Sequence, residues 1–189
     1  MRLILYILIL LSVLFPQDQM FVGTRPLGMG GAFIAVADDG NTITWNPAGL
    51  PRLRRKEFTS SYADLYAMNI THSYAGVVWP FGDRIAVGFD WSNIGFDDQE
   101  LNYSENKLNF SLGYQPIKML SIGGTFKYLS RDMGLDGTSY GKTSGIGYDI
   151  GLLFSPLKKL RFGMGVYDLG GTDVTYKQNK VDETILGQS

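Results

Sequence analysis

The residue types that most often carry chemistry are scarce in this chain. Its 189 residues include no cysteine and one histidine, His72. Thiolate catalysis, disulfides and cysteine-based zinc sites are therefore excluded, and a histidine-based metal site or a Ser-His-Asp triad lacks partners. The run Asp97-Asp98-Gln99-Glu100 offers oxygens for Ca²⁺ or for proton transfer. We interpret this run as a solvated loop, and we expect no catalytic residue, no metal site and no cofactor.

The glycines at Gly28 and Gly30 superficially resemble a dinucleotide-binding loop. Such a loop follows the strand of a βαβ unit, and its acidic partner comes roughly 20 residues later. Here no such strand precedes the glycines, and Asp38 and Asp39 follow too soon. We therefore interpret the glycines as positions where the backbone packs closely against other structure. The formal net charge of −1 gives no basic field for a nucleic-acid partner.

The N-terminus has the pattern of an export signal. Met1-Arg2 is followed by an apolar run over residues 3–15 and a polar break from Pro16. This run is shorter than the ~20 apolar residues of a membrane-spanning helix, and no later segment is long enough. We expect residues 1–19 to be a signal peptide, although no small-residue cleavage motif precedes Gln17. The alternative is a buried N-terminal helix or strand.

The chain from residue 57 onward has the alternation of large and small side chains that is typical of β-strands. We predict strands at residues 57–66, 70–79, 84–93, 107–115, 120–130, 145–154 and 160–168, with an eighth beginning at 174–177. Most are roughly ten residues long, the length that crosses a bilayer when tilted. The sequence thus predicts an all-β fold, an antiparallel up-and-down β-barrel.

The two faces of these strands differ in a way that favours a membrane. In residues 84–93, Val87 and Phe89 share one face, and Ala86 and Gly88 share the other. Mid-strand charges fall on the small-residue face, where they would point into the lumen and pair with one another or with a plug: Asp90, Lys107, Lys127, Asp149 and Arg161. A Lys or Arg facing lipid near the midplane would cost ~2–4 kcal/mol. The alternative is a soluble exported β-barrel that binds lipid or acts structurally.

The connections between the predicted strands alternate in length. Residues 81–83, 116–119 and 155–159 form short turns, whereas residues 93–106 and 131–144 are long and polar. Outer-membrane barrels alternate tight periplasmic turns with long external loops in this way. Residues 20–56 would then lie at the periplasmic side or inside the barrel, as a plug before the strands of residues 57–189.

The strand count does not close a large barrel, and no clear last strand follows residue 177. An open sheet edge cannot face hydrocarbon. We therefore expect the N-terminal half of a larger barrel, with a complete eight-stranded barrel as the alternative.

The stretch from residue 25 to residue 50 resembles the N-terminal signature of FadL-like outer-membrane proteins, most closely the PorV/PorQ branch. The resemblance rests on Gly28, Met29, Gly30, Ala32, Ala35, Ala37, Asp38, Asp39, Trp45, Asn46, Pro47, Ala48, Gly49 and Leu50. It implies a location in the bacterial outer membrane and a plug, carrying the Asn-Pro-Ala box, inside a barrel of fourteen strands. It also implies either passage of hydrophobic small molecules or a role in type IX secretion with secreted proteins as partners.

The residue types of the Asn-Pro-Ala box also predict a local backbone conformation. Pro47 fixes its own φ and biases Asn46 to an extended conformation. The Asn46 side chain can then bond neighbouring backbone groups in a turn. Such a turn would end the plug where it meets the first strand, whereas the alternative is a plain loop.

Overall fold

The structure, a computed structural model, describes residues 22–97, 101–135, 138–157 and 159–169. The predicted signal peptide and the predicted eighth strand lie outside the described residues. The acidic run falls outside them too, apart from the backbone of Asp97.

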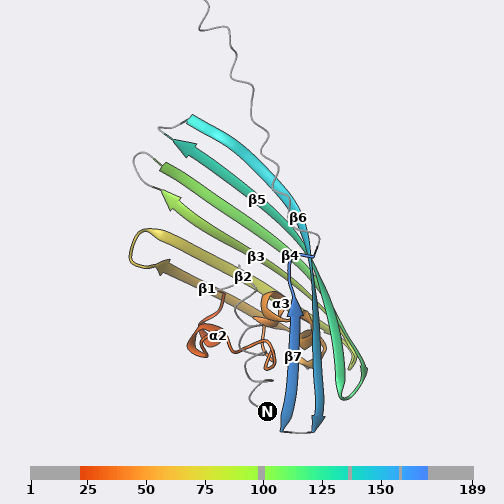
Figure 1. The fold of residues 1–189 in the computed structure, drawn as a ribbon. Helices are drawn as coiled ribbons and strands as arrows, with labels where there is room; N and C mark the ends of the chain where they lie inside the picture. Colours follow the sequence, from red (N-terminus) through yellow and green to blue (C-terminus); the bar gives the residue numbers. More distant parts are fainter. Residues whose placement is uncertain (1–21, 98–100, 136–137, 158, 170–189) are drawn as a thin grey trace, which may run out of the picture.

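One antiparallel sheet of seven strands, in sequence order, makes up most of the described chain. The strands are β1 (Glu57–Leu65), β2 (Ile70–Phe81), β3 (Ile85–Asp97), β4 (Leu101–Ile117), β5 (Leu120–Leu135), β6 (Thr138–Leu157) and β7 (Leu160–Val166). Each strand pairs with the next, and the sheet curls into half of a barrel (Figure 1). The predicted all-β, up-and-down fold is therefore confirmed as a partial barrel.

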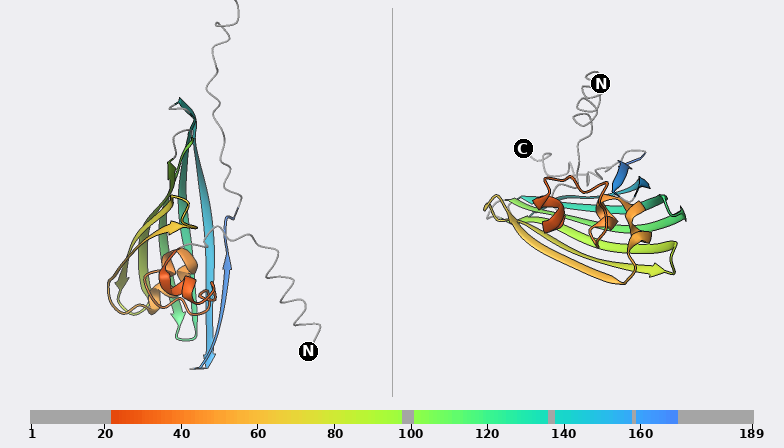
Figure 2. Two further views of the ribbon diagram at one scale, coloured as in Figure 1. Left: turned by 90° about the vertical axis from the view of Figure 1, so that its left-hand side faces the viewer. Right: turned by 90° about the horizontal axis from the view of Figure 1, so that it is seen from below.

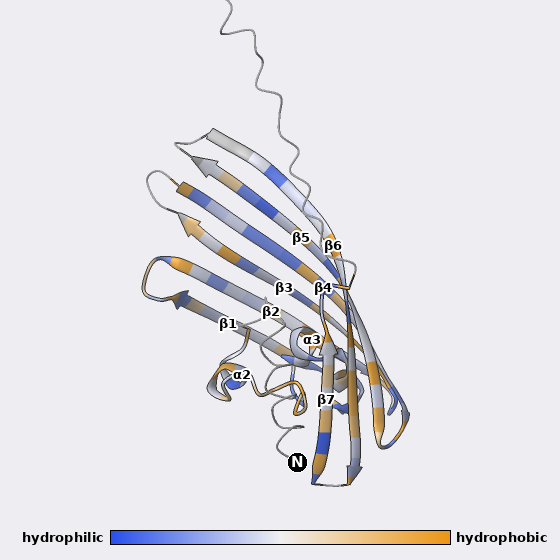
Figure 3. Ribbon diagram, in the orientation of Figure 1, coloured by the Kyte–Doolittle hydropathy of each residue, from blue (hydrophilic) through white to orange (hydrophobic). Residues whose placement is uncertain are grey.

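The alternation of side chains along β3 to β6 divides the two faces as the sequence predicts. On β4, Phe110 is 61% exposed on the outer face, whereas the neighbouring Asn109 and Ser111 are buried on the inner face. Ile146, Tyr148 and Ile150 of β6 are likewise exposed, with Gly147 and Asp149 buried between them. Figure 3 shows the resulting alternation of hydrophobic and hydrophilic residues along the strands. On β3 to β6 the outer face is thus mainly apolar, and the inner face carries mostly small or polar residues, with the buried Leu129 and Leu153 as exceptions.

The prediction of long loops at residues 93–106 and 131–144 is wrong. β3 continues to Asp97 and β4 begins at Leu101, and β5 and β6 likewise extend to Leu135 and from Thr138. The strand extensions pair in register, with Glu105 opposite Arg131 at an ion-pair distance of 2.7 Å. Asn, Ser and Gly in these stretches indicate turns in an isolated sequence, but neighbouring strands satisfy their backbone groups here. β3 to β6 therefore extend beyond the region in which their outer-face residues are large and apolar.

Residues 22–56, called the N-terminal segment below, lie on the concave face of the sheet (Figure 2). This segment contains α2 (Thr24–Gly28), α3 (Thr42–Trp45) and the 3₁₀ helix η1 (Pro47–Arg52). Among the described residues, no helix is long and apolar enough to cross a membrane.

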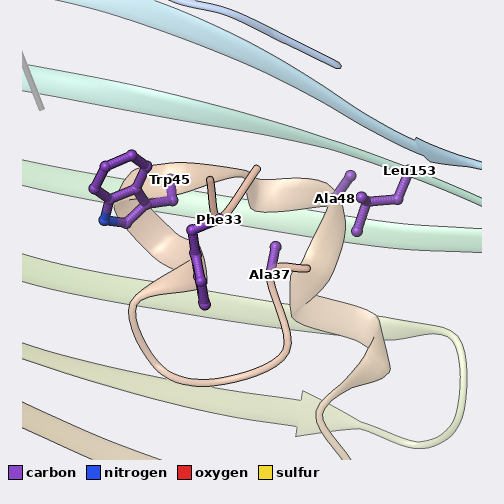
Figure 4. Packing of buried hydrophobic residues seen from close by; sticks show 5 residues of the cluster. All are labelled: Phe33, Ala37, Trp45, Ala48 and Leu153. Carbon is purple, nitrogen blue, oxygen red and sulfur yellow. The ribbon is translucent and has the colours of Figure 1, made fainter. Parts of the chain in front are cut away.

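Two buried clusters join this segment to the sheet. One comprises Phe33, Ala37, Trp45, Ala48 and the β6 residue Leu153, as Figure 4 shows. The other comprises Ile43, Leu50 and Leu53 with Val78 of β2 and Ala86 of β3. The core of the described chain therefore lies between the N-terminal segment and the strands, and the segment takes the place of a second sheet wall.

Candidate functional site

The Asn-Pro-Ala turn (Asn46, Pro47 and Ala48) is the most deeply buried part of the N-terminal segment. The Asn46 side chain is fully buried. Its Nδ2 donates to the carbonyl oxygens of Ile34 at 2.8 Å and Leu152 at 3.3 Å, and its Oδ1 accepts from the Ala48 N–H at 3.1 Å. One side chain thus closes the start of η1, holds the loop before α3 and attaches both to β6. A buried amide whose donors and acceptor are all used fixes the position of a turn.

A row of glycines on the inner face of the sheet makes room for this turn. Gly113, Gly123 and Gly151 of β4, β5 and β6 are direct cross-strand neighbours. A Cβ on Gly123 would lie 2.5 Å from the Ala48 nitrogen, and one on Gly113 would lie 2.5 Å from Pro51 Cδ. A Cβ on Gly151 would collide with Asn46 Oδ1. The row is therefore a seat shaped for the Asn-Pro-Ala turn and η1, because any side chain there would displace them.

Trp45 anchors the same turn from the other side. Its ring packs edge-on against Phe33 with centroids 6.2 Å apart, and its Nε1 donates to the Val22 carbonyl at 2.9 Å. The Trp45 carbonyl accepts from the Tyr167 hydroxyl at 2.5 Å. The indole and backbone of one residue thus connect the start of the N-terminal segment with the residue that follows β7.

Asp38 and Asp39 both form ion pairs with Arg25. The Arg25 Nη1 lies 2.7 Å from a carboxylate oxygen of each acid, and the Arg25 guanidinium stacks over the Phe33 ring at 5.4 Å. Hydrogen bonds to Asp38 and then to Asp39 raise the pKa of Arg25 above its usual value. Asp39 also accepts from the Asn41 N–H at 2.9 Å, which starts the turn into α3. Both carboxylates are thus committed to holding α2 against the loop.

The prediction of close packing at Gly28 and Gly30 is wrong. Both residues are exposed, and a Cβ at either would meet nothing within 4 Å. Gly30 instead adopts a φ of 63°, the left-handed conformation that glycine tolerates best, in the turn after α2. Close packing does occur at Gly49, where a Cβ would lie 2.7 Å from the Thr42 methyl. The conformational demand of the turn, and not a neighbouring wall, accounts for the glycine at 30.

Among the predicted lumen charges, Asp90 of β3 lies on the inner face and is fully buried. Its carboxylate accepts from Thr44 Oγ1 at 3.0 Å and from Asn109 Nδ2 at 2.8 Å. Thr44 belongs to α3, so this carboxylate joins the N-terminal segment to two strands. Thr44 and Asn109 are neutral donors, and a buried carboxylate needs such hydrogen bonds. The Asp90 carboxylate therefore holds α3 in position against β3 and β4.

Lys127 and Asp149 form a buried ion pair between β5 and β6. The Lys127 Nζ lies 2.8 Å from Asp149 and 2.7 Å from Asp168, which follows β7. The side chains of Lys127 and Asp149 are 8% and 3% exposed. Asp149 also accepts from the Asp168 N–H at 2.9 Å. Lys127 thus joins β5, β6 and the residues after β7 through one ammonium group.

The other two predicted lumen charges have different surroundings. Lys107 is half-buried on β4 and forms no ion pair with a described residue, so the expected pairing is not found there. Arg161 of β7 is exposed, and its Nη1 donates to the Val36 carbonyl at 2.5 Å. The Arg161 side chain therefore contacts a backbone carbonyl of the N-terminal segment and not a carboxylate. Within the described residues, no group of three His, Cys, Asp or Glu side chains could hold a metal ion.

Sequence reasoning missed the role of the glycine row and of Arg52. The Arg52 Nη2 donates to Ser155 Oγ at 2.9 Å, and its Nε lies 3.5 Å from Ser121 Oγ. Glycine at alternate positions of neighbouring strands is a signal that could have identified the row. Nothing in the sequence links Arg52 to residues 69 and 103 positions away.

Comparison with solved structures finds a similar fold. No protein-family model matches the chain, and no curated protein sequence matches it. A solved structure, the CymD monoaromatic hydrocarbon channel, superimposes with a TM-score of 0.62 at 18% sequence identity. The match covers 80% of this chain and 54% of that one, so this chain spans about half the length of the channel. This chain shares the fold of the matched part of that channel.

Proposed function

We propose that this chain forms part of the wall and plug of an outer-membrane β-barrel that passes small hydrophobic molecules. The observation that carries the proposal is the apolar outer face, on which Phe110, Tyr148 and Phe162 are all more than half exposed. Exposed apolar patches of this extent on a soluble protein are rare. In a bilayer they face acyl chains, and the inward charges avoid lipid.

The fold similarity to a monoaromatic hydrocarbon channel supports the class of substrate. The N-terminal segment supports the transport role, because it lies across the concave face where a lumen would run. Beyond its chain connection to β1, the segment is held to the sheet by noncovalent contacts. In this proposal residues 22–56 act as the plug. The FadL-like signature around Asn46 and Pro47 points in the same direction.

A second candidate is an accessory role in type IX secretion. It rests on the sequence of residues 25–50, which resembles the PorV/PorQ branch more closely than other FadL-like proteins. In that case the partners are exported proteins rather than hydrocarbons.

Two experiments test these proposals. The full-length gene product is expressed with its native leader, and outer membranes are separated and analysed by heat-modifiable gel mobility. A compact band from unheated outer membranes is expected, and a protein found only in the soluble fraction overturns the membrane proposal. Reconstituted vesicles are then assayed for uptake of toluene and of a water-soluble sugar. Because toluene also crosses a bare bilayer, toluene uptake that is faster than in protein-free vesicles, without uptake of the sugar, supports hydrophobic passage. Co-purification of exported proteins without this gain in uptake favours the secretion role.

A further inference from the structure

A pocket of about 350 Å³ lies between the β4–β5 turn and the adjoining ends of β6 and β7. Three cationic side chains from separate elements line it: Arg52 of η1, Lys118 of the first turn and Arg161 of β7. Ser155 of β6 adds a hydroxyl group. Charges that converge from three elements on one cavity form a three-sided arrangement suited to an anion.

The cations of this pocket are not neutralised by the described residues. Arg52 bonds only the hydroxyl groups of Ser121 and Ser155, and Arg161 donates to a backbone carbonyl. In the parts of the chain that the structure describes, no carboxylate lines the pocket or forms an ion pair with Arg52, Lys118 or Arg161. This lack of counter-charges concentrates positive potential in the cavity.

The neighbouring basic residues at the same end of the sheet show what a neutralised cation looks like. Arg54 lies 3.1 Å from Asp83, and Arg55 lies 3.6 Å from Glu57. The first residue of β1 and the last residues of β2, β4 and β6 all lie at this end, because the strands run alternately up and down. Among the described residues that line the pocket at this end, none carries a carboxylate.

The surroundings of Arg52 disfavour the charged form of its guanidinium group. Burial lowers the pKa of the Arg52 guanidinium below its usual value, and the nearby charge of Arg161 lowers it further. Two like charges held together in a partly buried place are stabilised by a bound anion. Arginine groups match the oxygens of phosphate in geometry as well as in charge.

The rim of the pocket adds a second preference. Leu157 and Leu160 line the pocket and are 65% and 44% exposed on the apolar outer face. A ligand with a phosphate group and an adjoining hydrocarbon chain would satisfy the cations and the leucines together. We propose that this pocket binds the phosphate group of a phospholipid headgroup. The lipid part of this inference rests on the proposed membrane location, whereas the phosphate part requires only the folded half-barrel.

The test uses the full chain purified in a non-ionic, phosphate-free detergent. Inorganic phosphate is titrated by equilibrium dialysis, and a short-chain phosphatidylglycerol is titrated by native mass spectrometry. We expect the lipid to bind more tightly than phosphate. We also expect Lys118→Gln and Arg161→Gln each to weaken lipid binding roughly tenfold, the loss of one charge-assisted bond.

Arg54→Gln is the matched control, because Arg54 lies at the same end of the sheet but is already paired with Asp83. Its binding should stay at the wild-type value. The Lys118 side chain bonds no described residue, so Lys118→Gln leaves the folded contacts intact, and heat-modifiable mobility checks this.

Three outcomes would overturn the inference. If the protein binds neither ligand, the pocket is not an anion site. If Arg54→Gln weakens lipid binding as much as the pocket variants do, the binding reflects the general surface charge and not the pocket. Binding of phosphate with no gain for the lipid removes the lipid assignment. A failure of hydrocarbon uptake with intact lipid binding would count against the transport role and not against this site.

Discussion

The side-chain amide of Asn46 donates to the backbone carbonyl of Leu152, which lies 106 residues further along the chain, at 3.3 Å. The same amide donates to Ile34 and accepts from Ala48. This one residue therefore fixes the N-terminal segment both to itself and to β6. If the segment is a plug, Asn46 sets where the plug meets the wall.

Replacing Asn46 with Asp tests this attachment. The change keeps the shape of the side chain but places an oxygen opposite the carbonyl groups of Ile34 and Leu152. We expect a loss of about 1–3 kcal/mol in the free energy of unfolding, because two buried acceptors lose their donor. The midpoint temperature of the heat-modifiable gel shift measures the effect. Asn69→Asp, at an exposed position in the turn between β1 and β2, should leave the midpoint unchanged.

Neighbouring glycines on β5 provide a matched pair for the glycine row. A methyl group on Gly123 would lie 2.5 Å from the Ala48 nitrogen, whereas one on Gly124 would lie 3.6 Å from its nearest neighbour, the Asp149 carbonyl. Gly123→Ala should destabilise the fold by about 1–3 kcal/mol through overpacking. Gly124→Ala should be neutral or slightly stabilising. Equal effects of the two changes on the unfolding midpoint would refute the seat.

The buried Lys127–Asp149 pair makes a prediction about charge. Lys127→Met leaves the Asp149 carboxylate buried without its cation, and we expect a cost of about 3–5 kcal/mol. Lys127→Met combined with Asp149→Asn should recover part of this loss, since the buried Asp149 carboxylate is removed and the other partner of Lys127, Asp168, is 38% exposed. Lys142→Met is the control: Lys142 is 74% exposed beside Asp132, and loss of such a pair costs about 0–1 kcal/mol. Denaturant unfolding followed by tryptophan fluorescence distinguishes the four proteins.

The outer face makes a prediction that depends on depth. Phe126 lies on the outer face in the middle of β5, whereas Ile85 begins β3 on the same face at one end of the sheet. Phe126→Arg should cost about 2–4 kcal/mol in a bilayer and reduce recovery from the membrane fraction. Ile85→Arg should cost about 0–1 kcal/mol, because a residue near the interface reaches water. If both variants fold equally well in lipid vesicles, the outer face does not contact hydrocarbon.

Periodicity by itself was enough to predict the central parts of the strands and the two faces of β3 to β6. The positions of Phe110 and Ile150 on the outer face and of Asn109 and Asp149 on the inner face follow from a period of two, which is a local property of extended chains. The turn at Asn46 and Pro47 could also be predicted from a local property, because proline restricts its own φ and the conformation of the residue before it.

Only the tertiary structure decided which residues meet across the concave face. The seat formed by Gly113, Gly123 and Gly151, the pairing of Asp90 with Thr44, and the meeting of Arg52 with Arg161 all join parts of the chain that no local rule connects. It also decided that residues 93–97 and 101–106 continue as strands, because neighbouring strands supply backbone partners that a single segment cannot show. Local preferences determine the backbone conformation of each residue, whereas contacts between distant residues depend on how the sheet curls.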